Sequence, residues 1–358
     1  MKHILISLLI CVAINASAQK DFTPKDITVN GYIETYYSYD FGNPEKHNRP
    51  LFIYSFNRHN EVNLNLGYIK AALQKDIFRV NLGLMTGTYV NANLAAEPGV
   101  LKNIFEANAG IKISKTKNLW IDAGIFSSHI GFESAIGKDC WNLTRSILAE
   151  NSPYYESGLK ISYTSPNEKW YLSGLILNGW QRIQRIDGNN TPAFGHQLTY
   201  KPNASITLNS SSFIGSDKAD SVRQMRYFHN FYGIFQLTPK LALTTGFDFG
   251  AEQKFKGSSK YNNWFSPVII LKVSPNAKNN ISARIEYYKD ENGVIISTAT
   301  PNGFNTLGYS VNYDYLIRNN IICRIEGRGF SGKDKTFVKD GKPINYNFSF
   351  TTSLAVSF

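Results

Sequence analysis

The chain of 358 residues is poor in cysteine and methionine, with three of each, and it has no apolar run of the ~18 residues that a membrane-spanning helix needs. These shortages exclude a disulfide-based scaffold and a helical membrane protein. Charged residues make up 18% and hydrophobic residues 42%, which excludes a disordered tail or a highly charged coiled coil. Aromatic residues are abundant, with 23 Phe, 21 Tyr and 5 Trp.

The first residues have the pattern of a secretory signal. A basic start is followed by an apolar stretch over residues 4–14 and by Ala16-Ser17-Ala18, which suits cleavage before Gln19. A buried N-terminal helix is the alternative. We therefore expect residues 1–18 to be a cleaved signal peptide and residues 19–358 to form a single domain. Removal of Lys2 lowers the formal charge from +11 to +10, and Cys140 and Cys323 remain as two free thiols.

Hydrophobic residues beyond residue 28 recur with period two, which is typical of β-strands with two different faces. In the last segment, Tyr346, Phe348 and Phe350 alternate with Asn347 and Ser349, and the alternation continues to the C-terminus. Two segments fit less well: residues 170–178 are apolar on both faces, and residues 62–73 suggest a bulge that shifts the phase. The sequence predicts sixteen strands, at residues 29–40, 60–74, 77–88, 104–114, 118–127, 155–164, 169–178, 194–201, 204–214, 224–237, 240–251, 263–273, 279–289, 304–315, 319–330 and 345–358.

The connections between these segments alternate strictly between short and long. Short ones carry turn residues, such as Lys75-Asp76 and Pro202-Asn203, whereas long ones are polar. All turns then lie at one end and all long loops at the other. This layout predicts an all-β fold, a transmembrane antiparallel β-barrel of about 16 strands with short periplasmic turns and long extracellular loops. Closure is required because hydrocarbon leaves no partner for a free sheet edge.

Charged residues recur on the polar faces of the predicted strands. They would be costly in a dry core but not in a water-filled lumen. Barrels of this size leave such an aqueous channel. The predicted pore-lining residues are Glu34, Arg79, Glu106, Lys112, Asp122, Lys160, Lys272, Arg284, Glu286, Arg324, Glu326 and Arg328.

Aromatic residues near the strand ends suggest two girdles at the membrane interfaces. Trp120, Trp170 and Phe358 are expected at the turn end. The girdle at the loop end is expected to contain Tyr36, Tyr37, Tyr39, Phe126, Trp264, Tyr287 and Phe330.

The sequence resembles the OmpL-like β-barrel porins of Gram-negative bacteria over nearly the whole mature chain. The resemblance is carried by residues 31–37 (GYIETYY), 124–133 (GIFSSHIGFE), 144–146 (TRS), 152–158 (SPYYESG) and 178–181 (NGWQ). It implies a barrel in the outer membrane with a pore function, but no particular substrate. The terminal Phe358 resembles the signal by which barrel-insertion machinery recognises its clients.

The sequence contains no catalytic or metal-binding motif, so we expect neither enzyme activity nor a cofactor or metal. The remaining histidines, His47, His59, His129, His196 and His229, show no metal-ligand spacing. His129, beside Ser127, Ser128 and Glu133, is the one cluster that suggests a barrel lipase or protease. The carboxylate pairs Asp290-Glu291 and Asp217/Asp220 are interpreted as solvated loop residues.

The longest connection, residues 128–154, is the third long loop from the N-terminus, the one that narrows the channel in general porins. By that analogy we expect it to constrict the lumen, with Glu133, Lys138, Asp139, Arg145 and Glu150 as its charged residues. The alternative is a loop that caps the barrel from outside or contacts a neighbouring molecule.

These patterns predict an outer-membrane porin for passive diffusion of small hydrophilic solutes. The predicted pore-lining residues are seven basic and five acidic, which indicates a slight anion preference. The positive charge is expected to meet lipopolysaccharide phosphates rather than nucleic acid, and a homo-oligomer is compatible with the sequence. The alternatives are a barrel enzyme and a non-conducting surface or adhesin barrel.

Overall fold

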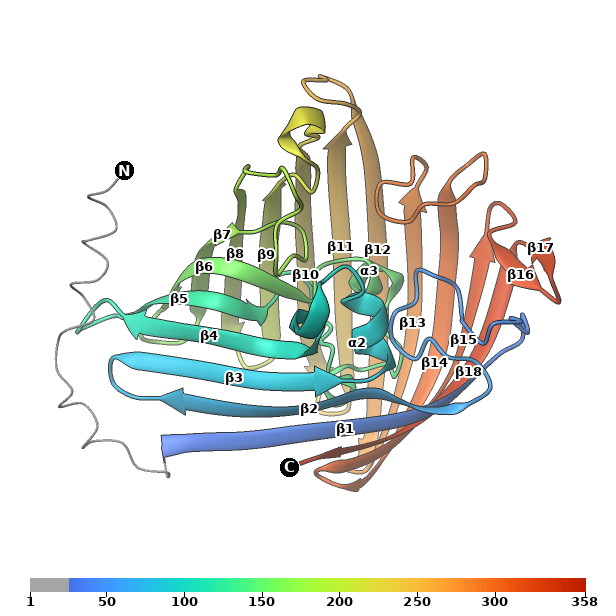
Figure 1. Ribbon diagram of the computed structural model, residues 1–358. Helices are drawn as coiled ribbons and strands as arrows, with labels where there is room; N and C mark the ends of the chain where they lie inside the picture. Colours follow the sequence, from blue (N-terminus) through green and yellow to red (C-terminus); the bar gives the residue numbers. More distant parts are fainter. Residues whose placement is uncertain (1–25) are drawn as a thin grey trace.

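The backbone of the computed structural model, which describes residues 26–358, forms one closed antiparallel β-barrel in which the first strand pairs with the last (Figure 1). The predicted signal segment, residues 1–18, lies outside the described residues. The barrel strands are β1 (Ile27–Asp40), β2 (Val62–Gln74), β3 (Phe78–Thr86), β4 (Ile104–Lys112), β5 (Asn118–Ser127), β6 (Tyr155–Thr164), β7 (Trp170–Leu177), β8 (Ala193–Asn203), β9 (Ile206–Gly215), β10 (Arg226–Thr238), β11 (Leu241–Gln253), β12 (Tyr261–Asn276), β13 (Asn279–Asp290), β14 (Phe304–Arg318), β15 (Ile321–Gly332) and β18 (Tyr346–Ser357).

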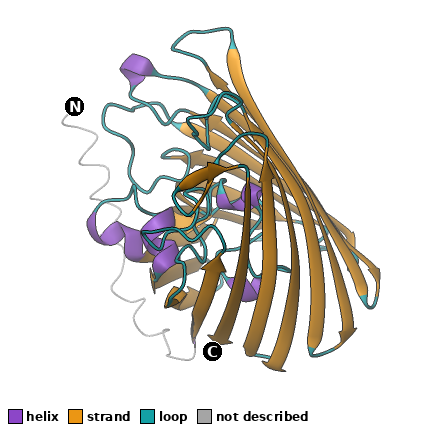
Figure 2. Cartoon of the chain, turned by 90° about the vertical axis from the view of Figure 1, so that its right-hand side faces the viewer, coloured by secondary structure: helices purple, strands orange, loops and turns teal. Residues whose placement is uncertain are grey.

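The sixteen predicted strands are confirmed, each close to its predicted range. Short connections and long loops also alternate as predicted, so the loops gather at one end of the barrel (Figure 2). The alternation of short and long connections in the sequence gives this result directly. A tight turn is enough to reverse an antiparallel strand, and because every strand reverses direction, every second connection lies at the same end.

Seven short elements in the long loops were not predicted. A hairpin of β16 (Phe337–Lys339) and β17 (Lys342–Ile344) lies outside the barrel order. The short helices are α2 (Thr88–Asn93), η4 (Gly99–Asn103), η5 (Gly137–Asp139), α3 (Ile147–Glu150) and η6 (Asp220–Val222). None of the helices within residues 26–358 is long and apolar enough to cross a membrane.

Closure is completed by hydrogen bonds at the chain ends. The Gly31 amide donates to the Phe358 carbonyl at 2.8 Å, and the Phe358 amide donates back to the Gly31 carbonyl at 3.0 Å. The Phe358 ring lies over Gly31, where a side chain on residue 31 would collide with it. The seam then continues from Tyr32–Ser357 to Asp40–Ser349 without a register shift.

The outer face of the barrel is hydrophobic and the inner face is polar. Exposed positions include Ile33, Leu82, Ile269, Ile285 and Val311, whereas the residues between them are buried inside and are mostly polar or charged. This distribution is the one expected of a wall with lipid outside and polar groups within.

The two irregular segments have physical explanations. A register shift between Glu34 and Thr35 confirms the predicted bulge, with Asn65 as the extra residue of β2. In β7, Leu175 and Leu177 face inward and are buried in a hydrophobic cluster. That strand is apolar on both faces because its inner face is covered by protein near the loop end.

The prediction of the aromatic girdles was wrong for five residues. Tyr36, Trp120, Phe126, Trp264 and Phe330 are at most 5% exposed and lie in the interior. The prediction used the position of each residue along its strand but not the face on which it lies. Trp170 and Phe358 are exposed, at 40% and 66%, as an interface position requires.

Closure at the β1–β18 seam predicts a specific disulfide. Tyr37 and Thr352 are direct partners, and facing residues of antiparallel strands have Cα separations of about 4.5–5.5 Å, which a disulfide spans. We expect Tyr37→Cys/Thr352→Cys, in a Cys323→Ser background, to form an intramolecular disulfide that changes mobility in a non-reducing gel. Tyr37→Cys/Phe247→Cys, with residues on distant strands, is the control. Equal cross-linking of the two pairs would contradict closure.

Candidate functional site

The loop of residues 128–154, called the inner loop below, leaves the wall at β5, crosses the barrel and returns at β6. Near its start, the His129 ring lies 2.8 Å from the Ser212 carbonyl on β9. Further on, the Lys138 amide donates to the Tyr32 hydroxyl on β1. The Leu143 amide donates to Asn312 on β14 at 3.1 Å. The inner loop therefore lies inside the barrel and contacts walls far apart in sequence. Its helix α3 is labelled in Figure 1.

A network of buried charged residues on β13 and β15 holds the inner loop. Arg284 donates to the Thr144 carbonyl at 2.7 Å and contacts Glu326 at 3.1 Å. Glu326 also accepts the Thr144 amide at 2.5 Å. Glu286 accepts the Ile147 amide at 2.5 Å and pairs with Arg328 at 2.7 Å. These charges are paired with one another and bonded to loop backbone, which compensates for their burial.

A second anchor holds the short helix η5 of the inner loop. Arg324 donates to the carbonyls of Gly137 and Cys140 at 2.6 and 2.9 Å. Its remaining donors reach Asp314 on the neighbouring strand, at 2.7 and 3.1 Å. An arginine fork suits this position because it donates to a carboxylate and to backbone carbonyls at the same time.

The five charged residues predicted for the inner loop divide into two groups. Glu133, Arg145 and Glu150 are buried, whereas Lys138 and Asp139 are exposed. Arg145 donates to three carbonyls of its own loop, at Ser134, Ala135 and Leu143. Glu133 accepts the amide and hydroxyl of Ser146 and thereby supports the start of α3 (Ile147–Glu150).

Glu150 links the inner loop to the first long loop. Its carboxylate accepts the Tyr54 amide at 3.0 Å and the Ser55 amide at 3.2 Å. Burial raises the pKa of the Glu150 carboxyl to about 7, because a charged group loses its hydration there, although Arg145 opposes this shift.

The twelve predicted pore-lining residues also divide by environment. Seven are at most 3% exposed: Asp122 and six residues that the loops cover, which are Glu34, Arg284, Glu286, Arg324, Glu326 and Arg328. Four border cavities: Arg79, Glu106, Asp122 and Lys160. Lys112 and Lys272 are partly exposed, and the Lys272 ammonium lies 4.5 Å from the centre of the Trp141 ring.

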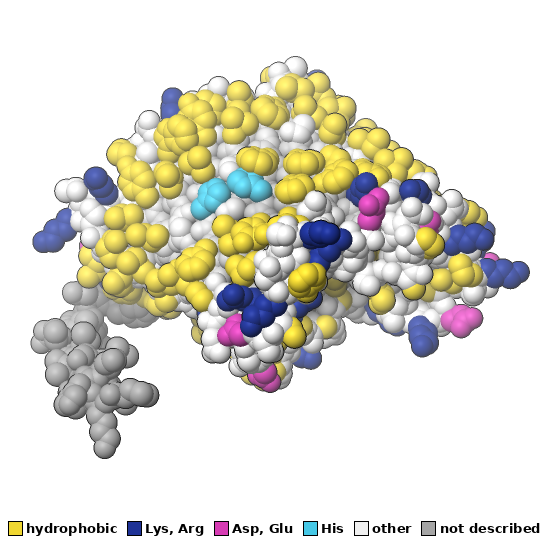
Figure 3. Space-filling model, turned by 90° about the horizontal axis from the view of Figure 1, so that it is seen from above, with side chains coloured by type: hydrophobic (Ala, Val, Ile, Leu, Met, Phe, Trp, Pro, Cys, Tyr) yellow, Lys and Arg dark blue, Asp and Glu magenta, His cyan; other side chains and the backbone are white. Residues whose placement is uncertain are grey.

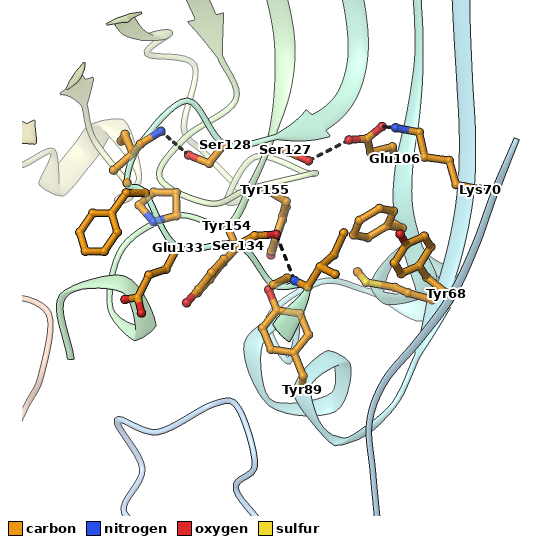
Figure 4. A pocket seen from close by; sticks show the side chains of 18 of the residues that line it. Tyr68, Lys70, Tyr89, Glu106, Ser127, Ser128, Glu133, Ser134, Tyr154 and Tyr155 are labelled. Carbon is orange, nitrogen blue, oxygen red and sulfur yellow. Dashed lines mark hydrogen bonds and ion pairs between the residues drawn. The ribbon is translucent and has the colours of Figure 1, made fainter. Parts of the chain in front are cut away.

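Four cavities follow one another along the inner wall, and each shares lining residues with the next. A loop-end cavity of about 390 Å³, which Glu150 borders, meets a central cavity of about 320 Å³ at Tyr155. The central cavity shares Lys70, Glu106 and Ser127 with a wall cavity of about 340 Å³ (Figure 4). That cavity shares Tyr171 with a turn-end cavity of about 570 Å³.

Tyrosines surround the junction between the loop-end and central cavities. The Tyr155 hydroxyl donates to Glu97 at 3.0 Å, and the rings of Tyr89 and Tyr154 lie edge to face with centres 5.7 Å apart. Figure 4 shows these three tyrosines together beside Glu133 and Ser134. Tyr89 lies in α2, and Tyr154 and Tyr155 lie where the inner loop returns to β6. Sequence spacing gave no sign that Tyr89 would meet the other two.

An interior aromatic cluster near the loop end was also missed. It contains Phe52, Phe213, Phe228, Trp264, Tyr288, Phe304, Phe330 and Phe337. Each member that lies on a barrel strand falls on the inward face of that strand, together with the polar inward residues. Large aromatics at inward positions near the loop end were therefore a usable sign that loops fold into the barrel.

His129 has a structural environment. One ring nitrogen lies 2.8 Å from Glu156 and the other 2.8 Å from the Ser212 carbonyl. Burial disfavours a charged ring, but Glu156 and the Ser212 carbonyl outweigh it and raise the pKa of the imidazole. The Ser127 hydroxyl donates to Glu106, and the Ser128 hydroxyl accepts the Ile130 amide. Neither Ser127 nor Ser128 is therefore bonded to His129, whereas nucleophilic catalysis needs a serine bonded to the histidine.

The acidic pairs bond to the loops, and the interpretation of them as solvated is wrong for Asp290, which is buried. Asp290 accepts three amides, from Val294 to Ile296. Asp217 accepts the Trp180 amide and Asp220 the Asn190 amide. Within the described chain no group of three or more potential metal ligands occurs, and Cys140 and Cys323 are free thiols, as predicted.

A closed sixteen-stranded barrel with a loop folded inside defines a porin-like outer-membrane protein. The model of the family described as beta-barrel porin-2, OmpL-like, matches residues 26–358, and the chain belongs to this family. No curated protein matches the chain.

Solved structures with the same fold share little sequence with the chain. OmpT of Vibrio cholerae matches with a TM-score of 0.61 and 8% identity, over 93% of this chain and 97% of that one. The channel DcaP of Acinetobacter baumannii matches with 0.61 and 10%, over 93% and 97%. An anion-selective porin from Comamonas acidovorans matches with 0.60 and 8%, over 93% and 99%. At such identities the likeness concerns the fold.

The anchoring network predicts a large loss of stability for Glu326→Ala. The change leaves Arg284 without one of its carboxylates and removes the acceptor of the Thr144 amide and hydroxyl. Breaking a buried ion pair in this way costs about 3–5 kcal/mol. We expect the urea midpoint of the refolded barrel to fall accordingly. The control is Glu291→Ala, whose partner Lys289 is 3.0 Å away at the surface; an equal effect there would refute the assigned role.

Proposed function

We propose that this protein is an outer-membrane porin through which small hydrophilic solutes diffuse passively, without a cofactor and without enzymatic activity. The observation that supports the proposal best is the chain of four cavities along the inner wall, each sharing lining residues with the next. Each of them is bordered by polar and charged side chains as well as by apolar and aromatic ones, so water and dissolved solutes find hydrogen-bond partners along the whole path.

The inner loop is proposed to constrict this path, with Glu133, Lys138, Asp139, Arg145 and Glu150 as its charged residues. Its location inside the barrel supports this role. Tyr155, which borders both the loop-end and the central cavity, is proposed to lie at the narrowest point. Of the twelve predicted pore-lining residues, Arg79, Glu106, Asp122 and Lys160 then meet the solute. Five of the six covered residues act by holding the loop, whereas Glu34 bonds to Asn65 on β2.

The proposed anion preference is slight. The four cavities are bordered by seven basic and six acidic side chains, so the charges nearly balance. The basic residues are Lys70, Arg79, Lys160, Lys169, Arg182, Lys201 and Arg226, and the acidic residues are Glu106, Asp122, Glu133, Glu150, Glu168 and Asp217.

The proposed route to the membrane begins with cleavage of residues 1–18. The C-terminal strand, with Phe358 exposed on the outside, is proposed to engage the insertion machinery. Exposed lysines in the loop after β11, at 254, 256 and 260, suit lipopolysaccharide phosphates. A homo-oligomer is proposed as well; a structure of Vibrio cholerae OmpT is described as a trimer form.

Conduction is tested directly by single-channel recording in a planar bilayer. We expect discrete channels, and we expect Tyr155→Ala to increase the conductance because it enlarges the junction between two cavities. Tyr315→Ala, on the outer face, is the control and should leave conductance unchanged. Silence over many insertions of folded protein would favour a non-conducting surface barrel instead.

The raised pKa of Glu150 predicts a pH-dependent selectivity. Below about pH 6 the carboxyl is neutral, and above about pH 8 it carries a negative charge beside the path, since its pKa is about 7. We expect the ratio of anion to cation permeability to fall as the pH rises across this range. Glu150→Gln, which cannot ionise, should lose this part of the change in reversal-potential measurements. An unchanged pH profile in the variant would show that Glu150 does not face the permeating ions.

A further inference from the structure

A row of polar side chains crosses the outer face of β8, β9 and β10. His196 pairs in register with Ser212, which pairs in turn with His229. Ser212 lies 2.5 Å from Nδ1 of His196, and Ser210 lies 2.9 Å from Nε2 of His229. The two imidazole centres are 5.5 Å apart. The two histidines and two serines, called the outer polar row below, therefore form one continuous patch.

The outer polar row lies within the hydrophobic exterior. On the same face, Phe194 and Tyr227 lie between the row and the loop end, and Leu208 and Phe231 lie towards the turn end. Figure 3 shows histidine side chains close together among hydrophobic ones on the surface seen from above. In a membrane this position faces acyl chains, which neither donate nor accept hydrogen bonds.

The hydrogen-bonding capacity of the row is half used. A neutral imidazole has one donor and one acceptor nitrogen. Among the described residues, Nε2 of His196 and Nδ1 of His229 have no hydrogen-bond partner, while the other nitrogen of each ring contacts a serine. Leaving two polar nitrogens in hydrocarbon is costly. A partner with polar groups at this depth would remove the cost.

Small residues lie beside the row on β7 and β9, and on β10 the His229 ring stacks on Phe231 with centres 4.0 Å apart. His196 lies beside Gly174 on β7 and Ser212 on β9, and Ser210 adds a second small side chain. Small residues at such positions let membrane-embedded backbones come close together, and polar side chains then bond across the contact.

We propose that the outer face of β8–β10 is an interface with a second copy of this chain, in which His196 and His229 form hydrogen bonds between the subunits. The inference requires the barrel to be in the membrane, but it does not depend on conduction.

A lipopolysaccharide phosphate fits this face less well than a second copy. Phosphate sites use clustered lysine and arginine, and the outward positions of the described strands β8–β10 between Phe194 and Phe231 carry neither. Tyr227 and Phe194 also separate the row from the loop end, where the head groups lie. A second barrel reaches the full depth of the wall.

The interface is tested by site-specific photocross-linking in intact outer membranes. A benzophenone amino acid at position 212 should give a cross-linked band at the mass of two chains. The same amino acid at Thr35, an exposed outward position on β1 across the barrel, is the control and should give none. No dimer band from position 212, with equal expression of folded protein, would overturn the proposal. So would a product that contains lipopolysaccharide instead of a second chain.

A second measurement separates the contact from folding and from conduction. In mild detergent, we expect Ser212→Trp to lower the mass measured by light scattering to that of one chain, while Thr35→Trp leaves the oligomer intact. His196→Leu/His229→Leu should weaken association by about three- to fifteen-fold per lost bond, typical of hydrogen bonds between membrane segments. Channel conductance should be unchanged in all three. Wild-type protein that is monomeric in lipid nanodiscs, or an oligomer that survives Ser212→Trp, would contradict the interface.

Discussion

Every backbone N–H and C=O group that faces hydrocarbon must find its partner within the protein, and the remainder of this structure follows from that constraint. The hydrogen bonds between Gly31 and Phe358 close the last gap in the ladder, so no strand edge is left open. Closure then fixes which side chains face lipid and which face inward, because successive residues of a strand alternate between the two faces. The hydrophobic exterior and the charged interior therefore both follow from the same register of strand pairing.

Inside the barrel, the same ladder supports a second structure made of loops. Arg284 and Glu326, which project inward from neighbouring regions of the wall, bind the backbone of the inner loop at Thr144. Buried ion pairs are weak contributors to stability on their own. Here the remaining bonds of Arg284 and Glu326 reach backbone groups of the inner loop and fix its position. The interior charges therefore have two roles: some border the cavities, and others fix the loop that shapes those cavities.

The sequence predicted the barrel well because the fold depends on local rules. Alternating residues, tight turns and even strand number are all visible within a few neighbouring positions, and even the bulge at Asn65 disturbed the pattern enough to be noticed. Assignments that depend on contacts between distant segments were harder. Trp264 and Phe330 were placed at the membrane surface, although they pack inside against loops. The contact of Tyr89 with Tyr154 and Tyr155 depends on loop conformation, which the period-two pattern of the strands does not predict. The analogy with general porins did identify the right loop to consider, but the division of its charged residues into exposed and buried groups required coordinates.

The inner loop is anchored mainly to strands that follow it in the chain by well over a hundred residues, as the bonds from Thr144 to Glu326 and from Gly137 to Arg324 show. When only the first third of the barrel has formed, this segment can make its contacts with β1 and the first long loop but not those with β13–β15. Its docking site is completed only when the C-terminal strands are in place, which are also the strands that close the wall. Docking of the inner loop and closure of the barrel wall must therefore be completed together. A change that prevents the final strands from pairing would leave a sheet with an edge open to lipid and an inner loop that is not anchored.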